Sequence, residues 1–279
     1  MLVVDSHAHL YPCYTLEKAL EAASFNLSTL AKEALNKGEQ TGSELSPVTR
    51  VLVLTERQDC HFYDSLASGQ YHTHGYRLTL LRANEGKGSV LMVLANHGGP
   101  FYILPGRQVI TAERLEILAL GTREAIQNGY PWMKALEEIA GRGAYPVLCW
   151  SPGKWLFKRG RVVAEILSTV KPTELSIGDT ALRPQGFPKP LLMRKAERAG
   201  FAVLAGSDPL PVPGEEECLG SYGTLLDAIV DESRPFSSIL KALRGQGRIV
   251  GRRHHLLKAA GRLIRNWAAA HAPQRPEQL

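Results

Sequence analysis

The sequence predicts an α/β fold: a single (β/α) barrel, distorted or seven-stranded, with a C-terminal amphipathic helix. The chain has 279 residues, 44% of them apolar, which suits one domain with a large core. Short apolar runs alternate with segments of helical spacing, as in folds whose parallel strands are covered by helices. Polar, chemically reactive residues follow several of these runs, at the positions where barrels of this kind assemble their active sites.

The first elements follow this rhythm. Residues 2–4 form a short apolar run, and residues 14–37 then repeat leucine and alanine at helical spacing. Residues 51–54 are apolar throughout, which is typical of a strand buried on both faces. We therefore expect a strand, a helix and a second strand, with polar residues at the carboxyl end of each strand.

The pattern changes between residues 76 and 120. Turns that contain Gly and Asn separate four apolar runs, which cover residues 78–81, 90–94, 102–104 and 115–120. Some of these runs are expected to pair as antiparallel hairpins.

Regular alternation returns after residue 130. Helices are expected over 132–140, 156–170 and 191–199, and strands over 146–150, 174–177 and 201–205. This order implies right-handed crossovers between parallel strands.

The chain is divided here into a barrel, residues 1–250, and a basic C-terminal helix with its tail, residues 251–279. In the second segment one stripe of apolar residues recurs at helical spacing: Leu256, Ala260, Leu263, Ile264 and Trp267. This stripe is expected to dock on the barrel, with a membrane-surface helix as the alternative. The residues after His271 are rich in Pro and Gln and are expected to fray.

The net charge of +6 is concentrated near the end of the chain, because residues 233–276 contain no Asp or Glu. Ten basic residues lie there: Arg234, Lys241, Arg244, Arg248, Arg252, Arg253, Lys258, Arg262, Arg265 and Arg275. Such a region can attract nucleic acid, an anionic membrane surface or a phosphorylated substrate. A solvated helix face is the interpretation that we favour, so nucleic acid is a possible but not a favoured partner.

Two further features bear on location. No run approaches the roughly 18 apolar residues that a bilayer-spanning helix requires, so no membrane span is expected. No charged-then-apolar leader precedes the first strand, and four cysteines are scattered without a C-x-x-C pair: Cys13, Cys60, Cys149 and Cys218. We therefore expect a cytoplasmic protein.

His7 and His9 are the strongest candidates for chemistry. Residues two apart in an extended segment point the same way, so both imidazoles can bind one cation, and Asp5 shares that parity. Because these residues follow an apolar run, they are expected at the mouth of the barrel. Asp208 follows another apolar run, and its carboxylate could bind the same metal or take a proton from metal-bound water.

Other polar groups stand near expected strand ends. Lys154 lies in a glycine-containing turn between Trp150 and Trp155, which suits an anionic ligand. Asp179 and Arg183 follow a later strand, and a loop-capping role competes with a functional one.

Four other histidines are weaker candidates, and His61 is one of them. His72 and His74 repeat the ligand spacing, but no apolar strand precedes them, and His97 is interpreted as a turn residue. The chain has no Gly-x-Ser-x-Gly elbow for a nucleophilic serine and no phosphate-binding Gly-x-x-x-x-Gly-Lys loop.

Two stretches resemble the metallo-dependent hydrolase barrels: Val4-Asp5-Ser6-His7-Ala8-His9-Leu10 and Ala205-Gly206-Ser207-Asp208. Within that superfamily, the polymerase-and-histidinol-phosphatase (PHP) family competes with the amidohydrolase and TatD-like families. Residues 103–120 are similar to the PHP stretch in which a Gly-x-Glu precedes a strand that contains His, and they favour the PHP family. The resemblance covers residues 2–225.

The chain departs from the PHP ligand pattern at five places. Thr55-Glu56-Arg57 stands for Thr-Asp-His, Gln108 for the Glu of Gly-x-Glu, and Glu116 for the following His. Ser151-Pro152 replaces His-Pro, and Asp208-Pro209-Leu210 replaces Asp-x-His. The resemblance therefore implies one or two metals rather than a trinuclear cluster.

The site that the resemblance implies can be stated residue by residue. Its metal ligands are His7, His9, Glu116 and Asp208, which hold divalent Zn, Mn or Fe. Asp208 and Glu56 are the catalytic candidates, with Glu56 as a ligand or a base. A small anionic substrate would be bound by Arg57, Lys154 and Arg183, although Arg57 could instead pair with Asp59 or Glu56.

Three functional hypotheses follow. The first is a metal-dependent phosphoesterase of the PHP type. The second is an amidohydrolase or TatD-like hydrolase acting on a C–N or lactone bond. The third is a non-catalytic, PHP-like binding protein that uses its basic C-terminal region.

Overall fold

The computed structural model describes residues 1–36, 48–71, 73–83, 88–95 and 99–271. Its strands are β1 (Leu2–Ala8), β2 (Thr49–Glu56), β3 (Tyr76–Arg82), β4 (Ser89–Ala95), β5 (Phe101–Ile110), β6 (Glu116–Leu120), β7 (Tyr145–Cys149), β8 (Ser176–Thr180), β9 (Val203–Gly206), β10 (Tyr222–Leu226) and β11 (Gly247–Gly251). Its helices are α1 (Leu16–Asn36), α2 (Phe62–Ala67), α3 (Trp132–Gly141), α4 (Phe157–Thr169), α5 (Leu191–Arg198), the 3-10 helix η1 (Glu215–Cys218), α6 (Pro235–Ala242) and α7 (Leu256–His271).

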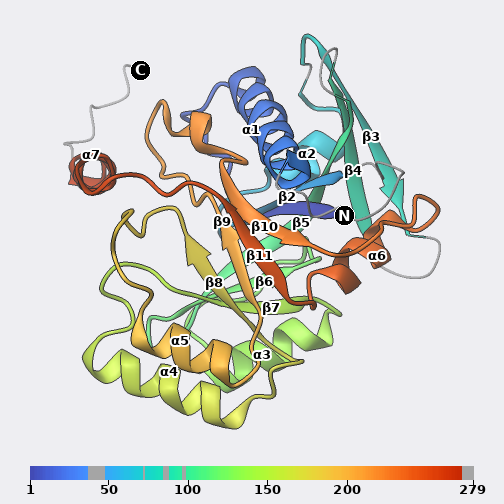
Figure 1. Ribbon diagram of the computed structural model, residues 1–279. Helices are drawn as coiled ribbons and strands as arrows, with labels where there is room; N and C mark the ends of the chain where they lie inside the picture. Colours follow the sequence, from blue (N-terminus) through green and yellow to red (C-terminus); the bar gives the residue numbers. More distant parts are fainter. Residues whose placement is uncertain (37–47, 72, 84–87, 96–98, 272–279) are drawn as a thin grey trace, which may run out of the picture.

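These strands form one mixed sheet that curls into a nearly closed barrel, as the sequence predicted (Figure 1). Neighbouring strands follow the order β11-β10-β1-β2-β5-β6-β7-β8-β9, and the hairpin of β3 and β4 joins the sheet beside β5. The expected helices 14–37, 132–140, 156–170 and 191–199 correspond to α1, α3, α4 and α5. β10, β11, α2 and α6 were not predicted.

The barrel is irregular because β6 runs against the parallel strands on either side of it. β1, β2 and β5 are parallel, and so are β7, β8 and β9. β6 lies between these two sets and is antiparallel to both of its neighbours. The first residue of β6, rather than its last, therefore lies at the end of the barrel where the parallel strands finish, which is called the mouth below.

β9, at one edge of the sheet, packs against β1, β10 and β11 near the other edge and so closes the barrel. The Ser6 hydroxyl donates to the carbonyl of Ala205 (3.0 Å), and the amide of Asp208 donates to the carbonyl of His7 (2.8 Å). Gly206 allows this approach, because a Cβ atom there would lie 2.4 Å from the His7 nitrogen. The His7 segment and the Asp208 segment thus meet at the mouth.

Three large apolar clusters form the core of the protein. The barrel interior is filled from alternate positions of the strands, and α6 closes it at the end opposite the mouth. α1 covers one side of the outer surface of the barrel. α3, α4 and α5 cover the opposite side, as Figure 1 shows.

The expected docking face of the C-terminal helix was partly wrong, although Leu263 does pack against a buried apolar cluster. Ile264 and Trp267 are 65% and 64% exposed, and Leu256 is also exposed. The face of α7 that meets the barrel instead buries Ala259 and Arg262. A buried ion pair between Arg262 and Glu215 (2.7 Å) turns this polar face inward. In the described part of the chain, no helix combines the length and apolar character needed to cross a membrane.

Candidate metal centre

Three side chains converge at the mouth from two distant parts of the chain. His7 Nε2 lies 3.0 Å from His9 Nε2, and Asp208 Oδ1 lies 3.6 Å and 3.7 Å from these two nitrogens. All three residues are buried. The Thr180 hydroxyl donates to the other carboxylate oxygen of Asp208 (2.9 Å), which orients that carboxylate toward the imidazoles.

A register irregularity in β1 aims the two histidines. Leu2 and Val4 point into the barrel, whereas Val3 and Ala8 face α1, so the alternation shifts between Asp5 and Ala8. His7 and His9 therefore turn to the interior. Asp5, which was expected to point the same way, points to the other face.

The Asp5 carboxylate is occupied elsewhere. It accepts hydrogen bonds from the Ser207 hydroxyl and from the amides of His7, Ser207 and Gly220. Burial raises the pKa of Asp5 to about 6, against the effect of these hydrogen bonds. Asp5 ties β1 to the loops after β9 and η1 and supports the group without joining it.

Glu116 joins this group because β6 is reversed. Its Oε1 atom lies 3.5 Å from His7 Nε2, and Lys154 Nζ donates to its Oε2 atom (2.6 Å). Burial alone would raise the pKa of Glu116, but His7 and Lys154 lower it below its ordinary value. Glu116 is therefore a carboxylate at neutral pH.

Cys149 is a neighbour of the group that sequence reasoning missed. It ends β7 on the interior face, with its Sγ atom 3.7 Å from His7 Nδ1, and His7, Glu116 and Cys149 form a second set of potential metal ligands. Gly178 on the adjacent strand leaves room for the thiol, since a Cβ atom there would lie 2.6 Å from it. The alternation along β7 was the signal that could have found Cys149.

Burial and the nearby Glu116 and Asp208 carboxylates keep the pKa of the Cys149 thiol well above its ordinary value. Burial and the nearby His7 lower the pKa of His9 to about 3, so that the His9 imidazole is neutral at neutral pH. A neutral imidazole is the form that binds a metal.

The donor set fits a divalent cation. Ligand atoms with bonds of about 2.1 Å lie about 3.4 Å apart in a tetrahedral shell and about 3.0 Å apart in an octahedral one. The separations from His7 Nε2 to its neighbours run from 3.0 to 3.6 Å. Imidazole nitrogens mixed with carboxylate oxygens suit Zn, Mn or Fe.

The group opens into a cleft of about 620 Å³. His9, Glu116 and Asp208 form its floor, and Arg57, Gln108, Ser151 and Lys154 are among its polar lining residues. α7 contributes Leu263, Asn266 and Ala270 to its wall. The cleft can therefore hold a small molecule against the candidate ligands.

The three predicted anion-binding residues are placed differently. Lys154 lies inside the cleft, bound to Glu116. Arg57 stands at its rim, 3.3 Å from Asp59, so the surface pairing considered from the sequence is formed. Arg183 does not line the cleft. It is buried and donates to both carboxylate oxygens of Asp179, which also accepts a hydrogen bond from the Tyr222 hydroxyl.

Glu56 does not join the candidate ligands. Its carboxylate is buried away from the cleft lining, where it accepts a hydrogen bond from the Tyr63 amide (2.9 Å) and lies 3.6 Å from Arg107. Arg107 in turn donates to the carbonyls of Cys60 and Arg123. From this position Glu56 cannot act as a ligand or as a base at the candidate metal centre, so that prediction was wrong. His72 and His97 lie outside the described residues, and His74 is exposed and lines a different pocket, beside α1.

Raising the pH from about 5 to about 8 is expected to remove stability that depends on Glu56. Burial raises the pKa of Glu56 from 4.5 to about 7, so the folded protein holds a proton that the unfolded chain has already released. This stability is full at low pH and is lost as the pH rises through about 7, by on the order of 2–3 kcal/mol.

Urea unfolding across this pH range measures the effect. Glu56→Gln should flatten the profile, whereas Glu165→Gln, at an exposed site on α4, should leave it unchanged. The same pH slope in the wild type and in Glu56→Gln would contradict this account of Glu56.

Comparisons with known proteins bear on the fold. The structure is similar to that of PsfC from Pseudomonas syringae, with a TM-score of 0.55, 15% sequence identity and 96% of each chain covered. A two-domain protein from Bacteroides vulgatus that contains a predicted PHP-like metal-dependent phosphoesterase has a TM-score of 0.46 and 11% identity, with 90% of this chain and 64% of that chain covered. No family model and no curated protein sequence matches the chain. The likeness to PsfC extends over nearly the whole chain and shows a shared fold.

Proposed function

We propose that this protein is a metal-dependent hydrolase that cleaves phosphoesters, with one or two divalent cations held by His7, His9, Glu116 and Asp208. The observation that carries the proposal is the convergence of two imidazoles and a carboxylate within 3.7 Å of one another on the floor of a cleft. When bound there, a divalent cation would lower the pKa of water and polarise a phosphoryl oxygen.

Neighbouring groups orient the candidate ligands. Thr180 orients the Asp208 carboxylate, and the backbone of Thr55 accepts a hydrogen bond from His9. Such partners outside the ligand shell fix ligand orientation and tautomer. With these ligands in place, Asp208 is the group best positioned to accept a proton from water in the cleft.

Cations in the cleft support an anionic substrate. Lys154 presents its ammonium group beside Glu116, and Arg57 stands at the rim. A phosphate entering the cleft can compete with Glu116 for Lys154 and meet the Arg57 guanidinium, whose planar fork suits phosphate oxygens. An uncharged amide or lactone would use neither cation, and for this reason we favour phosphoesters over the C–N and lactone bonds of the alternative hypothesis.

Metal analysis and two substrate panels test the proposal. Protein purified without chelators or affinity metals should contain about one equivalent or more of Zn, Mn or Fe. It should hydrolyse members of a phosphomonoester and phosphodiester panel and lose that activity in His9→Ala. Turnover confined to an amide and lactone panel would select the amidohydrolase-like alternative. If the protein neither contains nor takes up divalent metal, the remaining hypothesis is the non-catalytic binding protein.

A further inference from the structure

Exposed apolar side chains gather at the mouth end of the barrel. Twelve large apolar side chains are exposed among the described residues, and eight of them stand on three segments: Leu156, Phe157, Phe187, Leu191, Leu256, Leu257, Ile264 and Trp267. Phe157 and Leu257 are 89% and 87% exposed. A scatter of single apolar residues over a surface is ordinary, but a concentration at one end marks an interaction site.

The topology places these three segments together. Residues 150–161 follow β7, residues 181–195 follow β8, and residues 252–271 follow β11. β7 and β8 end at the mouth, and β11 ends there too, because it is antiparallel to β10, which is itself antiparallel to β1. All three segments also line the cleft, through Lys154, Leu182 and Leu263 among others. These segments are called the mouth rim.

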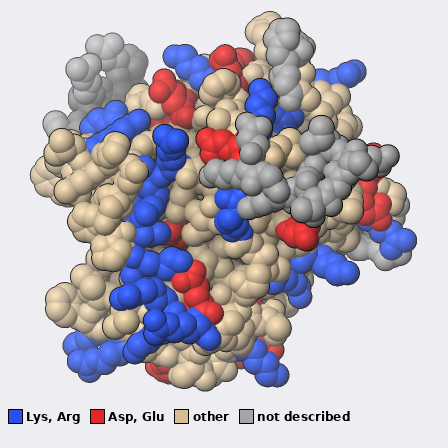
Figure 2. Space-filling view, in the orientation of Figure 1, with Lys and Arg blue, Asp and Glu red and all other residues tan. Residues whose placement is uncertain are grey.

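The mouth rim is also the most basic part of the chain. Its three segments hold thirteen Lys and Arg residues and no Asp or Glu, in a chain that has 27 acidic residues elsewhere. Figure 2 shows Lys and Arg in a band that runs beside α7 and down over α5 and α4. Arg183, Arg262 and Lys154 are engaged with carboxylates, whereas Arg252 and Lys258 are exposed.

We propose that the mouth rim docks this protein on the surface of an anionic lipid bilayer. An outward helix face bearing Leu, Ile and Trp, with Lys and Arg at its edges, suits the boundary between headgroups and acyl chains. α7 presents Leu257, Ile264 and Trp267 outward, with Lys258 and Arg265 beside them. Docking in this way holds the opening of the cleft against the headgroups.

Charge and apolar character together favour a bilayer over other partners. A nucleic-acid duplex would satisfy the cations, but its phosphate backbone provides no place for Phe157 or Leu257 to leave water. A second copy of the chain would bring the exposed cations of the mouth rim, such as Arg252 and Lys258, against their like, which opposes association. Anionic lipids satisfy both features, because they attract juxtamembrane cations and receive apolar side chains.

Vesicle co-sedimentation of the full chain tests the proposal. The protein should bind vesicles of phosphatidylcholine with phosphatidylserine and bind vesicles of phosphatidylcholine alone much more weakly. Binding should fall as salt is raised, since screening weakens the attraction of surface charges. The double variant Leu257→Ser with Ile264→Ser should lose at least about tenfold in binding. Arg252→Glu with Lys258→Glu should lose a similar factor.

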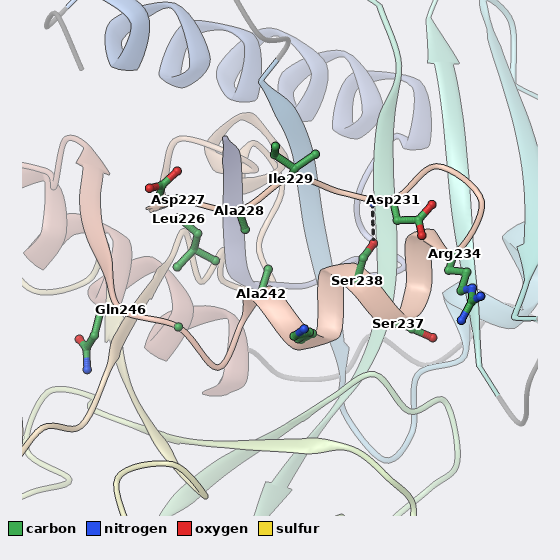
Figure 3. A pocket seen from close by; sticks show the side chains of 12 residues that line it. Leu226, Asp227, Ala228, Ile229, Asp231, Arg234, Ser237, Ser238, Ala242 and Gln246 are labelled. Atoms are coloured by element: carbon green, nitrogen blue, oxygen red, sulfur yellow. Dashed lines mark hydrogen bonds between the residues drawn. The ribbon is translucent and has the colours of Figure 1, made fainter. Parts of the chain in front are cut away.

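Matched controls lie at the other end of the barrel. Ile229 is 85% exposed beside the pocket between the 226–231 segment and α6, where Figure 3 labels it, and Lys241 is exposed on α6. Ile229→Ser and Lys241→Glu should bind vesicles within about twofold of the wild type. Thermal unfolding of each variant verifies that the barrel is intact.

Three results would overturn the proposal. One is the absence of sedimentation with phosphatidylserine vesicles at low salt. Another is an equal loss of binding in Ile229→Ser and in the Leu257 and Ile264 double variant. The third is salt-dependent binding of an oligonucleotide that the charge reversals abolish and the apolar variants spare, together with weak vesicle binding, which would identify the mouth rim as a nucleic-acid surface. None of these results depends on metal content or hydrolysis, so the proposed activity stands or falls separately.

Discussion

Replacing His7 by alanine is expected to weaken divalent-metal binding by more than about a hundredfold. This loss is larger than the roughly 10- to 100-fold loss that follows when a residue outside the ligand shell is replaced. His7 Nε2 lies 3.0 Å from His9 Nε2 and within 3.6 Å of a carboxylate oxygen of both Glu116 and Asp208. His7 is also the residue that the two potential ligand sets have in common. Its removal therefore leaves both sets without a shared ligand. Calorimetric titration with Zn²⁺ and Mn²⁺ would measure the loss of metal affinity.

His74→Ala is the matched control, because His74 is exposed and lies on the loop before β3. This variant should keep the affinity of the wild type. Asp208→Asn should also bind metal poorly while folding normally: Asp208 has a φ of 45°, and asparagine tolerates this backbone region as aspartate does. Metal binding that survives in His7→Ala, or that is lost in His74→Ala, would remove the mouth as the metal site.

Strand ends and alternation account for the part of the site that sequence reasoning placed correctly. His7 and His9 follow an apolar strand and Asp208 follows another, and the mouth of a barrel collects such residues from distant parts of a chain. The structure brings these three side chains together as expected. Their role as metal ligands remains a prediction, and the same holds for Glu116.

Local pattern could not supply three other features. The reversal of β6 depends on pairing with β5 and β7, and it decides that Glu116 reaches the mouth. The irregularity in β1 separates Asp5 from the histidines, because one shift in register turns every later side chain to the other face. Glu56 ends β2 but finds its partners, Tyr63 and Arg107, away from the cleft.

The C-terminal helix illustrates the limit of the apolar pattern. Hydrophobic periodicity places Ile264 and Trp267 inward, but the barrel meets α7 with the buried carboxylate of Glu215 as well as with the apolar cluster that Leu263 contacts. Because Glu215 is buried, a cation has to face it, since an unpaired buried charge is costly, and Arg262 fills that position. The exposed stripe that results is the basis of the proposed bilayer contact.

Arg262 also connects α7 to the candidate metal centre. Its side chain is fully buried and donates to Glu215 (2.7 Å) and to the backbone carbonyl of Asp208 (3.2 Å). The Glu215 carboxylate accepts a further, longer hydrogen bond from the Leu210 amide (3.4 Å). The same ion pair therefore holds the loop that carries Asp208 at two neighbouring points, Asp208 and Leu210.

Arg262→Met is accordingly expected to lower the free energy of unfolding by about 3 kcal/mol, since it leaves the buried Glu215 carboxylate with the half-exposed Arg265 as its remaining charged partner. Urea unfolding measures the loss, and Arg265→Met, which removes the exposed partner, should cost less than about 1 kcal/mol. The double variant Arg262→Met with Glu215→Met should recover most of the stability, because a buried ion pair can be replaced by apolar side chains of similar volume. Metal affinity should fall in Arg262→Met and stay low in the double variant, because neither restores the hydrogen bond to the Asp208 carbonyl. A loss as small in Arg262→Met as in Arg265→Met would show that the ion pair is not what fixes α7, and the inward face of this helix would then need another cause.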